Sequence, residues 1–214
     1  SGLPVARLEL LDAAALAAIN AFLHRSYPEQ PTLFLEFHAS SEAAMRQEAE
    51  VALELARHSG ATSLDVARTP EERSAQWEAR HKAYWAFTHQ FPGHRFLTTD
   101  VAVPLSRLPE AVAFARALLE ELGLPGRIVG HVGDGNFHVL VAVRPEEYDR
   151  AEAYSERLVR RALELGGTVS GEHGVGLRKR KFLAAEHGAA LGWMQRIKAL
   201  LDPDGILNPG KGAG

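Results

Sequence analysis

The sequence of 214 residues contains no cysteine, and this absence excludes disulfide bonds, thiolate metal sites and cysteine nucleophiles. An excess of positive charge is also missing. Lysine and arginine number 24 against 27 aspartate and glutamate, for a net charge of −3. A nucleic-acid-binding face is therefore not expected. Motifs of serine hydrolases, zinc peptidases and P-loop enzymes (G-x-S-x-G, H-E-x-x-H and the Gly-rich phosphate loop) are absent as well.

No hydrophobic run is long enough to span a membrane. The longest weakly polar stretch, residues 11–23, contains Asp12 and Asn20, and it is shorter than the roughly 18 apolar residues that a spanning helix requires. The chain begins Ser1-Gly2-Leu3-Pro4, with neither an initiating methionine nor a signal peptide. We therefore expect a part of a larger functional unit.

Hydrophobic residues make up 46% of the chain, which is enough to build a buried core. Period-two alternation and β-rich runs predict strands at residues 5–10, 32–37, 62–66, 96–103, 127–131, 137–143 and 168–170. Cap residues and helical periodicity predict helices at residues 12–24, 41–60, 70–87, 108–122 and 145–165, with a helical tail to about residue 202.

This order predicts an α+β fold in which helices cover an antiparallel sheet. The second half follows the β-α-β-β-α-β order of a split βαβ unit, and the first half is one strand short of the same plan. We expect one half at residues 1–88, a second at 96–175 and a helical C-terminal segment at 176–214, with the loop at residues 90–94 as the seam.

Histidine carries most of the chemical information. His131 and His138 stand at the two ends of a Gly-rich turn, where the flanking strand ends could bring both imidazoles to one point. Neutral imidazole is the commonest metal ligand in proteins. The alternative is a hairpin that carries two histidines without a metal, and spacing alone does not separate the two interpretations.

A second Gly-rich segment, residues 170–176, contains Glu172 next to His173. Glu172 could be a third, anionic metal ligand and His173 a proton acceptor, because two histidines and one carboxylate leave open positions for a substrate oxygen. The alternative is a turn with exposed polar residues.

Two further segments contain basic residues. Arg80 shares a helix face with Tyr84 and could bind a carboxylate; a salt-bridged surface arginine is the alternative. The basic run at residues 178–181 is of the kind that is usually solvated.

Three motifs in order resemble one known family: residues 130–138, residues 171–176 and residues 201–211. They are similar to the C-terminal domain of FAD-linked 2-hydroxyacid dehydrogenases, of the vanillyl-alcohol-oxidase type. Residues 31–38, 77–83 and 99–104 most resemble the cytochrome-linked, mitochondrial-type D-lactate dehydrogenases. The resemblance covers essentially the whole chain.

The resemblance implies a substrate, or cap, domain with two ferredoxin-like units, whose FAD is bound mainly by a separate N-terminal domain. It places a divalent metal, zinc or manganese, on His131, His138 and Glu172, and it makes His173 the proton-abstracting base.

For the substrate, the same resemblance assigns Arg80 to its carboxylate and sets Asn136 beside it. Tyr84 stands at a substrate-binding position. Asn208 belongs to a tail that returns to the flavin.

The sequence departs from relatives that act on larger hydroxy diacids. Those carry Thr at the position of Tyr84 and Lys at that of Thr98. With one cation fewer at these positions, a second substrate carboxylate would be poorly held, which favours a small monocarboxylate such as D-lactate.

The expected reaction is oxidation of a 2-hydroxy acid to the 2-oxo acid, with electrons leaving to a cytochrome or quinone. We expect a cytoplasmic enzyme or one peripheral to the inner face of a membrane. The chain alone is expected to be inactive, with an exposed flavin-facing surface that favours self-association. A metal-dependent hydrolase using the same His/His/Glu set and a non-catalytic carboxylate-binding domain are the alternatives.

Overall fold

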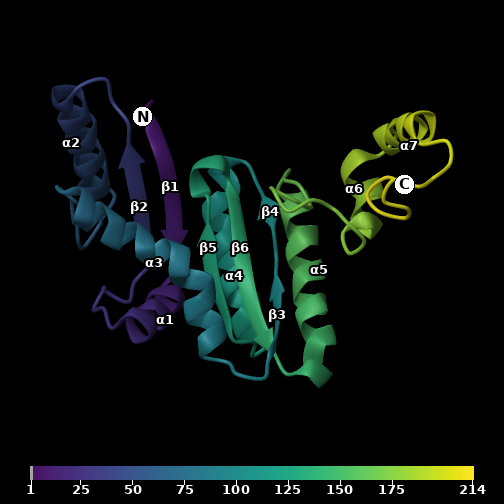
Figure 1. Cartoon of the computed structure of the whole chain (residues 1–214), viewed down its shortest axis with the longest axis horizontal. Helices are drawn as coiled ribbons and strands as arrows, with labels where there is room; N and C mark the ends of the chain where they lie inside the picture. The colour runs from purple at the N-terminus through teal and green to yellow at the C-terminus, as the bar shows by residue number, and fades with distance from the viewer. Residues whose placement is uncertain (1) are drawn as a thin grey trace. The chain divides into compact units, whose positions relative to one another are not determined.

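The chain folds as two units in the computed structural model, which describes residues 2–214 (Figure 1). The first unit comprises residues 2–92 and 129–133, and the second comprises residues 93–128 and 134–214. The α+β class and the antiparallel pairing predicted from the sequence are confirmed.

Three helices accompany two strands in the N-terminal part of the first unit. They follow the order β1 (Val5–Leu11), α1 (Ala13–Leu23), β2 (Thr32–Phe37), α2 (Glu42–His58) and α3 (Pro70–His89). Their starts are set by side-chain caps: Asp12 accepts from the amide of Ala15, and Thr69 forms a reciprocal capping box with Glu72. Strands β1 and β2 pair antiparallel, and β1 also pairs with the end of β5 through Leu10 and Gly130.

The core of this unit lies between α1 and α3. Alanines at positions 79, 83 and 86 recur every three or four residues along one face of α3, and they are buried. Small side chains on this face let α1 approach closely, and Leu16 and Ile19 fill the interface. This packing fixes α3, which carries Arg80.

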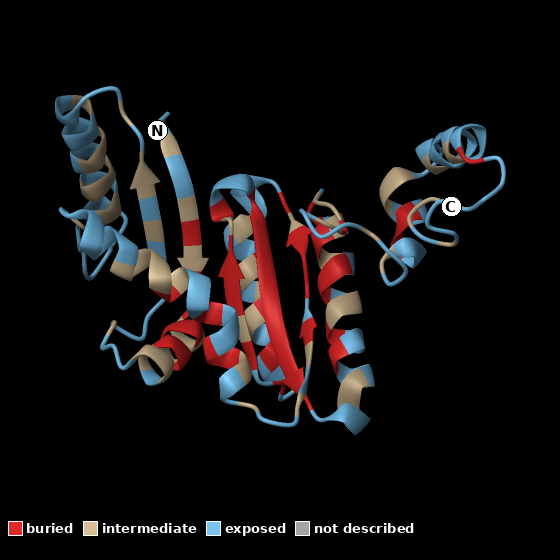
Figure 2. Cartoon of the chain, viewed as in Figure 1, coloured by how far each residue is buried: buried red, intermediate tan, exposed pale blue. Residues whose placement is uncertain are grey.

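The second unit is built on β6, of which every residue is buried (Figure 2). Its elements are β3 (Arg95–Thr98), β4 (Val101–Ala102), α4 (Leu108–Glu121), β5 (Gly126–Gly130), β6 (Asn136–Val143), α5 (Tyr148–Glu164), α6 (Leu183–His187) and α7 (Ala190–Leu201). Short 3-10 turns lie at Leu105–Arg107, Val132–Asp134, Pro145–Glu147 and Arg180–Phe182. The last two residues of β5 belong to the first unit.

Helix α5 covers β6 with a face of Ala151, Tyr154, Leu158 and Ala162, spaced by three or four residues. The hydroxyl of Tyr154 donates to the carbonyl of Ala115 at 3.0 Å and ties α5 to α4. Strand β6 pairs antiparallel with β3 and with β4. This frame holds the loops that carry the candidate site.

Three strand predictions need correction. Residues 62–66 form no strand; instead the Thr62 hydroxyl donates to Gln30 at 3.1 Å, and Asp65 accepts from Gln76 at 3.2 Å. The strand expected at 96–103 is broken at Thr99 and Asp100, because both side chains turn inward to hydrogen-bond to loops and β6. The strand expected at 168–170 is reduced to a single bridge between Thr168 and Ala102.

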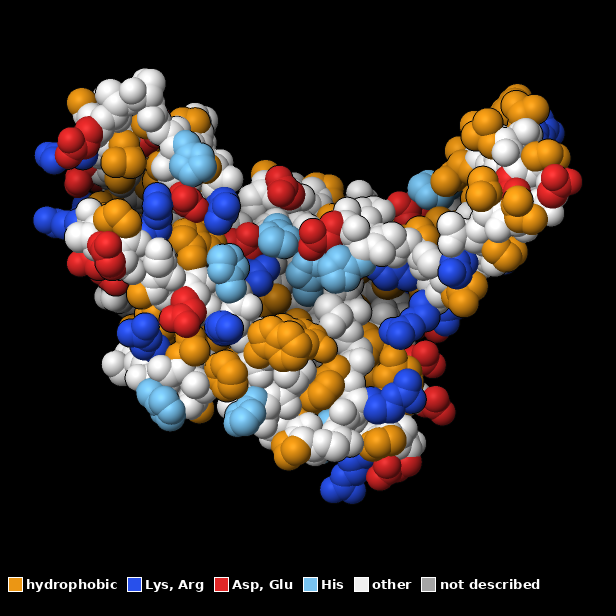
Figure 3. All heavy atoms as spheres, viewed as in Figure 1, with side chains coloured by type: hydrophobic (Ala, Val, Ile, Leu, Met, Phe, Trp, Pro, Cys, Tyr) orange, Lys and Arg blue, Asp and Glu red, His pale blue; other side chains and the backbone are white. Residues whose placement is uncertain are grey.

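The C-terminal segment presents many apolar side chains to solvent (Figure 3). They lie on and after α7 and comprise Trp193, Met194, Ile197, Leu200, Leu201, Ile206 and Leu207. Asp202 is buried at the end of α7 and accepts from the amides of Ile206 and Leu207, which turns the chain back. The tail then meets the preceding segment where Arg180 donates to the carbonyl of Gly210 at 3.0 Å.

Across residues 2–214, helices with the length and apolar character needed to cross a membrane are absent.

Candidate active site

A buried carboxylate organises the candidate residues of the first unit. Antiparallel pairing of Leu10 with Gly130 sets the next positions, Glu9 and His131, opposite each other. Glu9 Oε1 lies 2.5 Å from His131 Nδ1, and Glu9 Oε2 accepts from Arg80 Nε at 2.7 Å. The Glu9 side chain is only 9% exposed. Two residues expected to contact metal and substrate are therefore joined by a third that the sequence did not suggest.

This contact fixes the tautomer of His131. An ionised carboxylate can only accept hydrogen bonds, so Nδ1 of His131 carries the proton that Glu9 accepts. Histidines that bind metals commonly donate their other ring N–H to a carboxylate in this way. Arg80 uses Nε toward Glu9, and its two terminal nitrogens form the fork that binds carboxylates end-on.

A second buried carboxylate, Asp100, organises the candidate loop of the second unit. It accepts from the Ser170 hydroxyl at 2.6 Å, from the His173 amide at 2.9 Å and from the Glu172 amide at 3.2 Å. Lys179 Nζ donates to its backbone carbonyl at 2.7 Å. Asp100 thereby holds the backbone of residues 170–173 in place.

The electrostatics of Asp100 follow from these donors. Burial by itself would raise the pKa of this carboxyl, but the hydrogen bonds from Ser170, His173 and Glu172, with the charge of Lys179, hold its pKa well below its usual range. Asp100 is therefore ionised at neutral pH. Lys179, expected among the solvated residues of the run at 178–181, is instead half-buried against it.

His138 and Glu172 face each other in the second unit. His138 is buried on β6, with Nδ1 3.2 Å from the carbonyl of Thr99 and Nε2 2.7 Å from Glu172 Oε1. Burial lowers the pKa of His138, against the opposing effect of Asp100, so its neutral form is favoured. An imidazole nitrogen and a carboxylate oxygen so close together are both common ligands of divalent cations.

His173 lies beside this pair. Its ring stacks on that of His138 with the centroids 4.9 Å apart, and its Nε2 is 3.7 Å from Glu172 Oε1. Its side chain is 53% exposed, so substrate can reach it. A histidine that lies beside His138 and Glu172 and is open to solvent is placed to accept a proton.

Asn136 lies under the same loop and is buried, and within residues 2–214 its Oδ1 has no hydrogen-bond partner. Gly171 packs on it so closely that a Cβ at this position would lie 2.3 Å from Asn136 Nδ2. At the turn before β6, Gly135 has φ of +73°, and a Cβ there would lie 2.1 Å from the carbonyl oxygen of Val103. Gly135 is therefore required by close backbone approach, and Gly171 by its contact with the Asn136 side chain.

The candidate residues differ in where they lie. Of the three expected metal ligands, His131 belongs to the first unit, and His138 and Glu172 belong to the second. Tyr84 lies on α3 with its side chain exposed, against Trp85. Asn208 is exposed in the C-terminal tail with a positive φ of 47°.

Sequence reasoning missed Glu9, Asp100 and the buried role of Lys179. The alternation of residues 5–10 places Glu9 opposite the leucines of its strand, which normally means solvent, whereas Glu9 is buried. The one available signal at Asp100 was an acidic residue inside a predicted strand, where aspartate is depleted.

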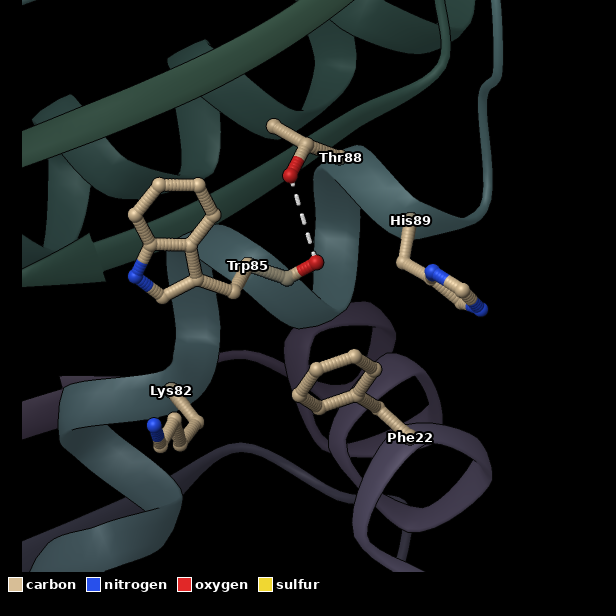
Figure 4. A pocket seen from close by; sticks show the side chains of 5 residues that line it. All are labelled: Phe22, Lys82, Trp85, Thr88 and His89. Atoms are coloured by element: carbon tan, nitrogen blue, oxygen red, sulfur yellow. Dashed lines mark hydrogen bonds between the residues drawn. The ribbon is translucent and has the colours of Figure 1, made fainter.

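A shallow surface cavity of about 370 Å³ lies elsewhere, between α1 and α3 (Figure 4). Its lining residues are Phe22, Lys82, Trp85, Thr88 and His89, and the Thr88 hydroxyl donates to the Trp85 carbonyl at 3.2 Å. None of the candidate residues lines it.

Comparisons with known proteins identify the family of the chain. Residues 1–212 match the family described as FAD linked oxidases, C-terminal domain. The chain is 45% identical over 99% of its length to a probable mitochondrial D-lactate dehydrogenase of Danio rerio, of which it covers 43%. It is 39% identical over 99% of its length to a mitochondrial D-lactate dehydrogenase [cytochrome] of Arabidopsis thaliana, of which it covers 38%.

A more distant relative acts, by its name, on another hydroxy acid: glycolate oxidase subunit GlcD of Escherichia coli is 31% identical over 95% of this chain, which covers 42% of it. The chain thus spans less than half the length of these relatives. Among solved structures, 4-ethylphenol oxidase from Gulosibacter chungangensis shares the fold with a TM-score of 0.60 at 15% identity, over 97% of this chain and 47% of that one.

Proposed function

Because the chain belongs to the family of FAD linked oxidase C-terminal domains, we propose that it is the substrate- and metal-binding part of an FAD-dependent dehydrogenase of small D-2-hydroxy acids. The reaction is oxidation of the hydroxy acid, in the first place D-lactate, to the 2-oxo acid. The observation that carries the proposal is the cluster of His138, Glu172 and His173, which sets a ligand pair beside a solvent-accessible base.

The residues fit a divalent metal, zinc or manganese. His131, His138 and Glu172 would hold it, because imidazole and carboxylate groups are ligands of these metals and Glu9 supports His131 as carboxylates support metal-binding histidines. A metal at these residues supplies Lewis-acid polarisation of the substrate hydroxyl. Three protein ligands leave positions open for substrate, as in catalytic rather than structural sites.

Separate residues of the chain bind the substrate, accept its proton and hold the loop in position. Arg80 binds the substrate carboxylate with its terminal nitrogens and fixes which C2 substituent faces the flavin. His173 accepts the hydroxyl proton on its imidazole. Asn136, whose buried Oδ1 has no hydrogen-bond partner within residues 2–214, contributes a polar contact beside the substrate. Asp100 holds the backbone of Glu172 and His173 so that both side chains keep their positions.

FAD, bound mainly by a separate N-terminal domain of the whole enzyme, supplies the acceptor for the C2 hydride. The tail that carries Asn208 and the exposed apolar residues of α7 are the parts that we assign to contact with that domain. Electrons then leave to a cytochrome or quinone. We place the whole enzyme in the cytoplasm or peripherally at the inner face of a membrane, where such acceptors are reached.

The substrate is a small monocarboxylate. Arg80 is buried against Glu9 and offers one carboxylate clamp, while Tyr84 and Thr98 add no cation for a second carboxylate. We therefore expect D-lactate to be preferred over hydroxy diacids.

The test uses the flavoprotein that contains this chain, with a redox dye as acceptor. D-lactate is expected to reduce the dye, and L-lactate and D-2-hydroxyglutarate much less. A chelator should abolish turnover, and Mn²⁺ or Zn²⁺ should restore it. His138→Ala should lose about one equivalent of metal with the activity. A metal-replete flavoprotein that leaves D-lactate unoxidised would contradict the proposal.

A further inference from the structure

We propose that Glu9 is a positioning residue that sets the separation between the substrate-binding arginine and a metal-ligating histidine. The inference rests on the proposed function and deepens it. It concerns one carboxylate, its two partners, Arg80 and His131, and the strand and helix that hold them, all within the first unit.

The geometry joins three distant parts of the chain. Glu9 lies on β1, Arg80 on α3 and His131 just after β5, 71 and 122 residues away in sequence. Each carboxylate oxygen serves one partner, Oε2 to Arg80 Nε at 2.7 Å and Oε1 to His131 Nδ1 at 2.5 Å. The bridge is rigid because β1 pairs with β5 and α3 packs on α1.

The chemistry requires a carboxylate at this position. Arg80 Nε and His131 Nδ1 are both donors, and only a group with two acceptor oxygens satisfies both. Glutamine has one acceptor oxygen, and its amide NH₂ would face the other donor. The Glu9 charge also stabilises the buried guanidinium, whose side chain is 17% exposed, and makes the His131 imidazole a stronger ligand.

The substrate explains why the two partners share one carboxylate. A 2-hydroxy acid carries its hydroxyl and its carboxylate on adjacent carbons, so the group that orients the carboxylate and the group that supports the hydroxyl must keep a fixed spacing. If the spacing changes, the substrate can no longer engage both groups at once, and its binding is weakened. Glu9 fixes that spacing without touching the substrate.

Glu9→Gln in the flavoprotein is the direct test, with Glu36→Gln as the matched control. Glu36 lies on β2, is 13% exposed and contacts an arginine and a histidine, Arg7 at 3.5 Å and His38 at 3.2 Å, away from Arg80 and His131. Two quantities are measured: the Kd for Mn²⁺ without substrate, from the electron paramagnetic resonance signal of free Mn²⁺, and KM and kcat for D-lactate at saturating Mn²⁺.

We expect Glu9→Gln to weaken Mn²⁺ binding about 10- to 100-fold, the effect typical of a lost outer-shell partner of a ligand. KM should rise about tenfold or more, while kcat at saturating Mn²⁺ changes by less than about threefold, because ground-state positioning is lost and His173 is untouched. Glu36→Gln should leave both quantities at the wild-type values.

Wild-type values for Glu9→Gln in both measurements would overturn the inference, and so would equal losses in Glu9→Gln and Glu36→Gln. If Glu9→Gln does not fold, Glu9→Asp is the second test. It keeps the charge but is one methylene too short to reach both partners. We therefore expect a smaller loss of Mn²⁺ affinity and a smaller rise in KM. A wild-type protein that binds no Mn²⁺ contradicts the proposed function itself, before any substitution is made.

Discussion

Replacing Asp100 with asparagine should destabilise the second unit without changing the volume of its core. The carboxylate is 1% exposed and faces four donor groups: the Ser170 hydroxyl, the amides of Glu172 and His173, and Lys179 Nζ. Asparagine keeps one acceptor oxygen and turns an NH₂ group toward the remaining donors. Lys179, only 14% exposed, then faces no negative charge at this position.

The size of the effect follows from the hydrogen bonds. Hydrogen bonds to a charged group contribute about 1.5–3 kcal/mol and neutral ones about 0.5–1.5, so weakening two or three of them costs about 3 kcal/mol. That value lies at the lower end of the roughly 3–5 kcal/mol measured when one partner of a buried ion pair is removed. For a chain of this size, about 3 kcal/mol corresponds to a fall in Tm of roughly 6–12 °C.

The loss of stability caused by Asp100→Asn should depend on pH. Because the pKa of Asp100 is lowered in the folded state, its contribution is fully present above the unfolded pKa of about 3.9 and is lost as pH falls below that value. The difference in unfolding free energy between wild type and Asp100→Asn should therefore be full at pH 7 and shrink below about pH 4.

Urea denaturation of both proteins at pH 7 and at pH 3.5 measures this difference, with Asp204→Asn as the control, since Asp204 is exposed in the turn after α7. Asp100→Asn should lower the urea midpoint at pH 7 far more than Asp204→Asn does. Equal midpoints for wild type and Asp100→Asn at pH 7, or a difference that grows toward low pH, would refute the role assigned to the ionised carboxylate.

Four other substitutions test three separate features. Gly135→Ala should cost roughly 2–4 kcal/mol, measured by urea denaturation, because a Cβ meets the Val103 carbonyl at 2.1 Å and φ is positive. Gly192→Ala, in the first turn of α7 with open space around it, should instead stabilise by up to about 1 kcal/mol. His173→Gln in the flavoprotein should lower kcat by about 10²–10⁴-fold with metal content unchanged, and loss of the metal would instead make His173 a ligand. Leu200→Lys should reduce self-association of the 214-residue chain in analytical ultracentrifugation, since Leu200 is 80% exposed; an unchanged sedimentation profile would exclude α7 as the contact.

Elements governed by local signals could be predicted from the sequence. Helices α1, α2 and α3 begin after Asp12, Ser41 and Thr69, each of which accepts a hydrogen bond from the first turn. Strand β2 was predicted at its observed bounds because its run of β-prone apolar residues follows a loop that contains Pro28 and Pro31. These signals act over a few residues, so no tertiary knowledge was needed.

The wrong strand predictions share a physical cause. A strand exists only where a partner accepts its hydrogen bonds, and β-prone residues do not supply one. Leu64 and Val66 are 38% and 44% exposed and have no ladder beside them. Asp100 breaks its strand because its side chain is committed to residues 170–179, more than 69 positions away.

In the candidate site, too, residues in local motifs could be predicted and residues that depend on distant partners could not. His131, His138, Glu172 and His173 were suggested by residue type and short spacing, and their roles as ligands and base stay predictions. Glu9 could not be found this way, because its partners are brought to it by strand pairing and helix packing rather than by any local motif.

The two buried carboxylates suggest how such a site tolerates open, Gly-rich loops. Loops that must admit substrate have few apolar contacts of their own, and the loop at residues 171–174 is exposed throughout. Asp100 compensates for the second unit by accepting several hydrogen bonds from that loop and its neighbours, and Glu9 does the same for the two partners of the first unit. Because each carboxylate sits on a packed strand or beside one, the positions of the exposed groups are set by the core, and removing either charge should disturb the site more than removing any single apolar contact near it.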